Sequence, residues 1–204
     1  ALTSQDFTYS FWVTAAFTVI SVITVNVFAF CIALLLTRKL RGTNFFRTVF
    51  FLPNLIGGIV LGYTWQQMIN AVLFKYGTTI VSQFKYGFVG LIILMNWQLI
   101  GYMMIIYIAG LQNIPTELIE AAEIDGATHM QTLFKVKIPM VMPSITICIF
   151  LTLSNSFKLF DQNLSLTAGA PLHKTEMLAL NIYQTFYGKV GQEGVGQALS
   201  LIHI

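Results

Sequence analysis

Four long stretches of this chain contain no charged residue. They cover residues 7–37, 48–74, 86–116 and 138–157, and the shortest of them is 20 residues long. The hydrocarbon core of a bilayer is about 30 Å thick and is crossed by about 20 apolar residues in a helix, which satisfies its own backbone hydrogen bonds. Each stretch is therefore long enough to span a membrane. The sequence predicts an all-α, polytopic integral membrane protein.

The composition agrees with a membrane protein and excludes several other classes. Of the 204 residues, 56% are hydrophobic and 9% are charged, whereas about 25% of the residues of a soluble domain are charged. Disordered and collagen-like chains are excluded by the same numbers. The formal net charge of +3 is too small to indicate a nucleic-acid partner.

We predict four complete helices and the start of a fifth. The four cover about residues 11–36, 49–68, 88–112 and 140–157, and the chain ends in an apolar stretch, 197–204, that is too short to span. The second helix contains Pro53, Gly57, Gly58 and Gly62, which kink a helix or let a neighbouring backbone approach closely. The whole chain, residues 1–204, is expected to form a single transmembrane domain that lacks the rest of its last helix.

Basic residues set the predicted topology. Arg38, Lys39, Arg41 and Arg47 lie between the first two predicted helices, so the positive-inside rule makes this loop cytoplasmic. Alternation then places residues 112–139 inside and residues 158–193 outside. A short helix from Thr175 to Tyr187, with its cap at Thr175, is expected in that outer segment.

Signatures of catalysis are absent from the sequence. It contains no glycine-rich loop for ATP phosphates, and His129, His173 and His203 lack the spacing of a zinc site. We expect no catalytic residue, no metal site and no cofactor. No carboxylate or lysine lies inside a predicted span, which disfavours a proton-coupled carrier. A secondary carrier or channel that works without an ATPase remains the alternative, because sodium coupling through carbonyls and hydroxyls leaves no such mark.

The inside loop, residues 112–139, has the strongest local pattern. Four of the eight acidic residues of the chain, Glu117, Glu120, Glu123 and Asp125, lie within nine positions. Pro115 suits the first turn of a helix, Gly126 ends that helix, and Thr128 with Gln131 forms a capping box that opens a second one. The first helix also carries many apolar residues, which indicates a docking partner. A solvated connecting loop is the competing interpretation.

The same loop resembles a known family. Glu120-Ala121-Ala122, then Gly126, then Val136-Lys137-Ile138-Pro139 is similar to the EAA loop in permease subunits of binding-protein-dependent ABC importers. Val136 and Ile138 depart from the usual Ile and Leu by small apolar exchanges. The segment Leu166-Thr-Ala-Gly-Ala-Pro171 resembles the corresponding sequence of the maltose-type branch of these permeases. Within it, Gly169-Ala170-Pro171 replaces the more usual Gly-Gly-Pro. The resemblance covers residues 90–204 well.

The resemblance implies a permease of the bacterial inner membrane, a chain from which the N-terminal helix or helices are missing, and a set of partners. They are a second homologous permease subunit, two ATPase subunits that bind ATP and Mg²⁺, an extracytoplasmic sugar-binding protein, and membrane lipid. The EAA loop would couple the chain to the ATPase through Glu120, Ala121, Ala122, Asp125, Gly126 and Pro139.

Sugar recognition uses amides, hydroxyls and aromatic faces, because a sugar ring offers hydroxyl groups and an apolar C–H face. Such side chains occur in two predicted spans near mid-membrane. We predict a substrate path lined by Trp97, Gln98, Tyr102, Thr152, Asn155 and Ser156. The competing interpretation is that these groups hydrogen-bond neighbouring helices, as we expect for Asn26 in the first span.

Overall fold

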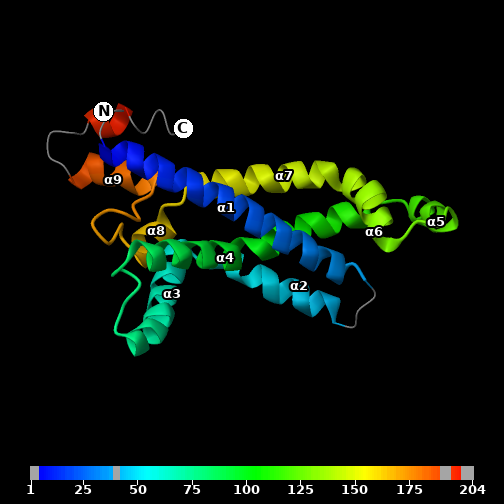
Figure 1. Cartoon of the computed structure of the whole chain (residues 1–204), viewed down its shortest axis with the longest axis horizontal. Coiled ribbons are helices and arrows are strands. Elements are labelled where there is room, and N and C mark those ends of the chain that lie inside the picture. Colours follow the sequence, from blue (N-terminus) through cyan, green and yellow to red (C-terminus); the bar gives the residue numbers. More distant parts are fainter. Residues whose placement is uncertain (1–4, 39–41, 189–193, 199–204) are drawn as a thin grey trace. The chain divides into compact units, whose positions relative to one another are not determined.

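The computed structural model describes residues 5–38, 42–188 and 194–198, and the regular structure of these residues is helical (Figure 1). This confirms the predicted all-α class. The long helices are α1 (Gln5–Leu36), α4 (Phe84–Gln112) and α7 (Ile138–Phe157). The shorter helices are α2 (Thr43–Phe51), η1 (Leu52–Leu55), α3 (Gly58–Leu73), η2 (Phe74–Tyr76), α5 (Thr116–Ile124), α6 (His129–Thr132), η3 (Leu133–Lys137), α8 (Asp161–Leu166) and α9 (Leu178–Gly188).

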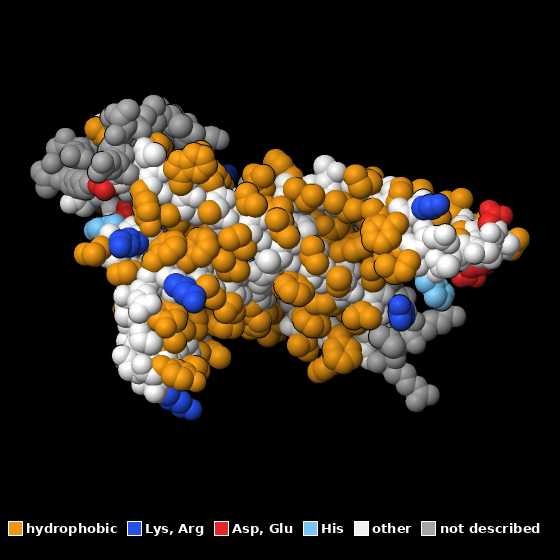
Figure 2. Space-filling model, viewed as in Figure 1, with side chains coloured by type: hydrophobic (Ala, Val, Ile, Leu, Met, Phe, Trp, Pro, Cys, Tyr) orange, Lys and Arg blue, Asp and Glu red, His pale blue; other side chains and the backbone are white. Residues whose placement is uncertain are grey.

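Three helical stretches in the described residues are long and apolar enough to cross a membrane. They are α1, α4 and the continuous stretch His129–Phe157, in which α6, η3 and α7 follow one another without a break. Figure 2 shows apolar side chains over most of the visible surface of the long helices. This exposure fits a lipid environment, because a soluble protein rarely exposes such large apolar areas. Three of the four predicted spans are thereby confirmed.

The second predicted helix, residues 49–68, is wrong as a single helix. α2 ends at Phe51, η1 is a short 3-10 turn, and α3 begins at Gly58. Pro53 has no N–H to donate to a helix, and Gly57 has an extended backbone (φ −60°, ψ 139°), so the helical hydrogen bonds stop here. A fourth span exists if the broken pair, Thr43–Leu55 and Gly58–Tyr76, is counted as one.

One of two compact units consists of Ala1–Val22, Ile56–Asn96 and Leu153–Ile204. In this unit α3 packs closely against α8. A Cβ atom at Gly62 would lie 1.8 Å from Ser165 Oγ, so the contact requires glycine. Gln66 Nε2 donates a hydrogen bond to the carbonyl of Leu166 at 2.8 Å. The expected close approach at Gly62 is confirmed, and the partner is the short helix α8.

The segment between α8 and α9 is organised by Asn163, which is fully buried. Its Nδ2 donates to the carbonyl of Thr175 at 2.8 Å, and its Oδ1 accepts from the N–H of Met177 at 3.0 Å. The Thr175 hydroxyl donates to the carbonyl of Ala170 at 2.6 Å. Thr175 therefore belongs to this loop and does not cap a helix. The predicted helix from Thr175 is wrong at its start, because α9 begins at Leu178.

The other compact unit consists of Ile23–Leu55 and Trp97–Thr152. Asn26 on α1 joins three helices in it. Its Oδ1 accepts from the Tyr107 hydroxyl of α4 at 2.7 Å, and its Nδ2 donates to Thr152 Oγ1 of α7 at 3.2 Å. The expectation that Asn26 makes a helix-packing contact is confirmed. A Cβ at Gly101 would lie 1.8 Å from the carbonyl oxygen of Phe50, so α2 approaches α4 at backbone distance.

Several predictions from the sequence are not tested by the described residues. Lys39 and Arg41 of the basic loop, residues 189–193 of the outer segment, and most of the expected terminal helix, residues 199–204, are outside the described residues. The single transmembrane domain over residues 1–204, the inside placement of 112–139 and the outside placement of 158–193 stay predictions.

Candidate functional site

The helix α5 ends in a tight and fully hydrogen-bonded turn. Gly126 has a left-handed backbone (φ 77°), and its N–H donates to the carbonyl of Glu123 at 3.0 Å. The N–H of Ala127 donates to the carbonyl of Ala122 at 2.9 Å. These two bonds form a Schellman motif, in which the residue at the left-handed position is usually glycine. The predicted end of the helix at Gly126 is confirmed.

The next helix begins in the predicted capping box. Gln131 N–H donates to Thr128 Oγ1 at 3.3 Å, and Gln131 Oε1 accepts from the Thr128 N–H at 2.8 Å. At the other end of the motif, Pro115 occupies the position before α5. The loop is therefore a helix, a defined turn and a second helix. Because the end of α5 and the start of α6 are both hydrogen-bonded within the loop, the turn between them has a defined shape.

The surface of this motif combines apolar and acidic side chains. No residue of α5 is buried, and Ile124 is 86% exposed. Figure 2 shows acidic side chains gathered in the region where Figure 1 labels α5. Charged groups do not enter the hydrocarbon core, whereas exposed Leu, Ile and Met side chains favour burial. The large exposed apolar residues of the motif are Leu118, Ile124 and Met130.

The motif continues into α7 through an irregular helix. Residues Leu133–Lys137 form the π-helix η3, and Pro139 follows in the first turn of α7. Proline has no N–H and disturbs the ordinary α-helical hydrogen bonds behind it, and single π turns are often found at functional sites. The turn and α7 are thus one continuous helical connection, with Thr132 buried at its start.

The structure places the residues of the predicted substrate path in different environments. In the unit that contains α5, Trp97 is 42% exposed, Gln98 is 9% exposed, and Tyr102 lies half-buried with its ring centroid 6.5 Å from that of Phe51. Thr152 is fully buried, and its hydroxyl donates to the carbonyl of Cys148 at 2.7 Å.

The remaining two path residues belong to the other unit. Asn155 is exposed, whereas Ser156 is fully buried and its Oγ has no hydrogen-bond partner among the described residues. Neighbours along α7 therefore face different surroundings. Thr152 accepts a hydrogen bond from Asn26 in the three-helix contact. This is the helix-packing role that the sequence analysis gave as the competing interpretation for such side chains. The assignment of all six residues to a path is still a prediction.

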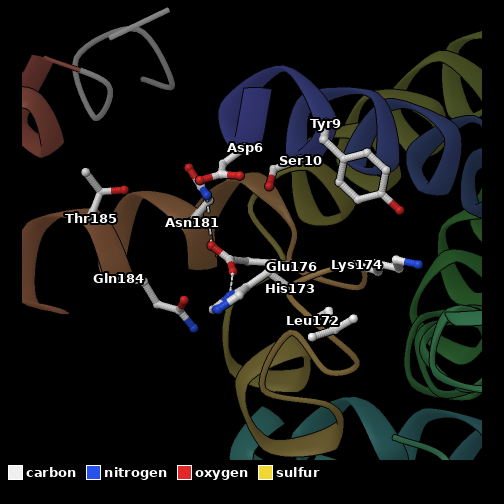
Figure 3. A pocket seen from close by; sticks show the side chains of 10 residues that line it. All are labelled: Asp6, Tyr9, Ser10, Leu172, His173, Lys174, Glu176, Asn181, Gln184 and Thr185. Carbon is white, nitrogen blue, oxygen red and sulfur yellow. Dashed lines mark hydrogen bonds and ion pairs between the residues drawn. The ribbon is translucent and has the colours of Figure 1, made fainter. Parts of the chain in front are cut away.

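The structure also contains a polar pocket that sequence reasoning missed. It has a volume of about 470 Å³ and is formed by the first turns of α1, the chain before α9 and α9 itself (Figure 3). Its two halves lie more than 160 positions apart in the chain, so no local spacing could reveal it. The lining residues are Asp6, Tyr9, Ser10, Leu172, His173, Lys174, Glu176, Asn181, Gln184 and Thr185.

The fold is that of the transmembrane domains of ABC importers. The chain superposes with a TM-score of 0.84 on a solved chain of a bacterial alginate ABC transporter in complex with alginate pentasaccharide-bound periplasmic protein. The match covers 99% of this chain and 74% of that chain at 18% sequence identity. An identity this low supports a shared fold and nothing further.

Sequence comparison defines the family. Residues 7–204 match the model of the "binding-protein-dependent transport system inner membrane component". The chain belongs to this family and is a multi-pass inner-membrane permease component. It is 47% identical over 205 residues to the probable starch degradation products transport system permease protein AmyD of Thermoanaerobacterium thermosulfurigenes, covering 97% of this chain and 70% of the relative.

The names of two further relatives refer to sugar transport. The chain is 33% identical to the multiple sugar-binding transport system permease protein MsmF of Streptococcus mutans, over 84% of this chain and 62% of that relative. It is 28% identical to the trehalose/maltose transport system permease protein MalF of Thermococcus litoralis, over 98% of this chain and 71% of the relative. The chain thus spans between 62% and 71% of the length of these three relatives.

Proposed function

We propose that this chain is one permease subunit of an ATP-driven importer of oligosaccharides. It pairs with a second homologous permease subunit and rests on two ATPase subunits, which bind ATP and Mg²⁺ and carry out the hydrolysis. Its substrate arrives from an extracytoplasmic sugar-binding protein. The observation that carries the proposal is the preformed helix-turn-helix at residues 116–132, with an exposed apolar and acidic surface.

The shape of this motif supports a role in mechanical coupling. Its turn is closed by the hydrogen bonds of Gly126 and Ala127, and its second helix is fixed by the Thr128 capping box. A protein that binds such a motif displaces it as a body, because no flexible joint absorbs the displacement within the turn. The π-helix η3 then passes the displacement to α7. We propose that an ATPase subunit is that protein.

The docking surface suits a protein groove with an apolar floor and a basic rim. Ile124 and Leu118 supply apolar area, and Glu120 and Asp125 supply negative charge near the turn. Apolar contacts buried in the centre of an interface supply most of the affinity, and rim charges mainly select the partner and its orientation. Ala121 and Ala122 have small side chains, which allow a partner to approach the backbone of α5.

The names of the relatives support an oligosaccharide as the substrate. The most informative is AmyD, whose name refers to starch degradation products and which is 47% identical to this chain. We propose α-linked glucose oligomers as the substrate class. Trp97 and Asn155 are exposed on helices that are apolar enough to cross a membrane, and an exposed amide on such a helix is better placed against protein or a hydrated path than against lipid. We propose that Gln98, Tyr102, Thr152 and Ser156 also contribute polar groups to this path.

The test is reconstitution of the natural complex in proteoliposomes. The full-length protein, its permease partner, the ATPase subunits and the binding protein are assembled, and uptake of radiolabelled maltotriose is measured with ATP inside the vesicles or absent. We expect uptake that requires ATP, the ATPase subunits and the binding protein. Uptake by the permease subunits alone, driven by an ion gradient, would instead establish the secondary carrier and overturn the proposal.

A further inference from the structure

The polar pocket of Figure 3 is a built site, because its central carboxylate is buried and fixed. Glu176 is 2% exposed. One carboxylate oxygen accepts from Asn181 Nδ2 at 2.8 Å, and the other is paired with His173 Nδ1. A buried carboxylate that is held on both oxygens keeps one orientation, since any rotation would break a bond in a low-dielectric setting. The pocket therefore has a defined polar floor.

Other polar side chains that line the pocket are available to hydrogen-bond a ligand. The side chains of Tyr9, Gln184 and Thr185 make no hydrogen bond within the described residues, although all three line the pocket. In Figure 3 Tyr9 and Lys174 lie on one side of the cluster formed by Glu176 and its two partners, and Gln184 and Thr185 lie on the other. A ligand that uses both sides has to be elongated and polar along its length.

The chemistry of the lining favours a neutral polyhydroxyl compound over an ion or an apolar molecule. Asp6 and Glu176 bring carboxylates to the lining and Lys174 brings an ammonium group, so charges of both signs line the pocket. Hydroxyl groups of a sugar donate to carboxylates and accept from amides and ammonium groups. Tyr9, which is 43% exposed, offers a ring face for the C–H side of a sugar.

The size of the pocket fits this class of ligand. Its volume of about 470 Å³ is in the range of small-molecule sites, about 300–1,000 Å³. We propose that the pocket is a waiting site on the extracytoplasmic side, which holds one end of an oligosaccharide before it enters the translocation path. This proposal rests on the proposed function and on the predicted outside placement of residues 158–193.

The experiment measures sugar binding to the assembled membrane complex without the binding protein. The full-length permease pair with its ATPase subunits is placed in nanodiscs without nucleotide, and binding of tritiated maltotetraose is measured by equilibrium dialysis. Two variants remove the free polar groups of the pocket with little change of shape, Gln184→Leu and Thr185→Val. The matched control is Gln67→Leu, which changes an exposed amide of α3 that does not line the pocket.

We expect each pocket variant to weaken maltotetraose binding about fivefold, as the loss of one hydrogen bond to a ligand does, and the control to bind as the wild type does. No binding by the wild type, or equal binding by all variants, overturns the waiting site. A loss of affinity for the binding protein with sugar binding unchanged overturns it in favour of a protein-docking role. Failure of ATP-dependent uptake by the wild-type complex would be a failure of the proposed function itself.

Discussion

Gly126 allows the proposed coupling role to be tested through a backbone effect alone. Its φ of 77° lies in the left-handed region, and a Cβ atom added there meets no atom within 4 Å. Gly126→Ala therefore causes no steric clash, and its whole effect is the penalty of a left-handed backbone, about 1–2 kcal/mol for a residue with a side chain. The turn would be weakened while the surrounding helices keep their contacts.

The expected consequence is weaker docking with normal folding. If the full penalty is transmitted to the docked state, affinity for the ATPase falls about 5- to 30-fold, because 1.4 kcal/mol corresponds to a factor of ten. We expect sugar-stimulated ATP hydrolysis in proteoliposomes to fall by a similar factor when the ATPase subunits are limiting. Gly126→Asn should retain more activity, because asparagine tolerates the left-handed conformation better than alanine does.

Gly77 supplies a matched control. It too has a left-handed backbone, with φ 68°, and a Cβ added to it meets nothing within 4 Å, but it lies in the turn after η2. Gly77→Ala should therefore carry the same local penalty and leave ATPase co-purification unchanged. If Gly126→Ala and Gly77→Ala affect co-purification and hydrolysis equally, the turn after α5 is not the docking element.

Three further predictions follow from particular residues. The topology can be tested with single cysteines placed at Thr43, Thr128 and Lys174 in a background without the two native cysteines. An impermeant thiol reagent added to intact cells should label the cysteine at position 174 alone. Labelling at position 43 or 128 would invert the topology. Asn26→Leu should lower the melting temperature of the purified complex, because two interhelical hydrogen bonds of about 0.6 kcal/mol each are lost, and an unchanged temperature would contradict this. Asn155→Ala should reduce maltotriose uptake with normal assembly; reduced yield with a normal uptake rate per complex would assign Asn155 to packing.

The parts of the fold that follow from local physics were predictable. A charge-free run of 20 or more residues that crosses a membrane satisfies its backbone hydrogen bonds as a helix, so α1, α4 and α7 can be predicted from the sequence. The run 48–74 differs because its helix breaks at Pro53 and Gly57. The Schellman turn and the capping box are equally local, because Gly126 and Thr128 satisfy backbone groups within five residues of themselves. Element ends that depend on such nearby groups can be assigned without a structure.

The features that escaped prediction depend on distant residues. The close packing of α3 on α8, through Gly62 and Ser165, joins residues about 100 positions apart. Thr175 resembles a helix cap in sequence, but its hydroxyl donates to Ala170 and its carbonyl accepts from Asn163. Hydropathy and spacing carry no information about such partners. The same reason hides the polar pocket, whose two walls meet only in the folded chain.

The contrast between α5 and α1 bears on what covers each of them. α1 exposes Trp12, Ile23 and Val27 without a charged residue between positions 7 and 36, so lipid can cover that surface. α5 exposes Ile124 beside Asp125, and Glu123 lies on its other side, so lipid cannot cover this residue without drawing carboxylates toward the hydrocarbon core. If water covers this surface instead, the apolar side chain of Ile124 stays unburied. A protein surface with an apolar floor and polar edges satisfies both requirements, and this is the physical argument for the proposed protein partner at the turn.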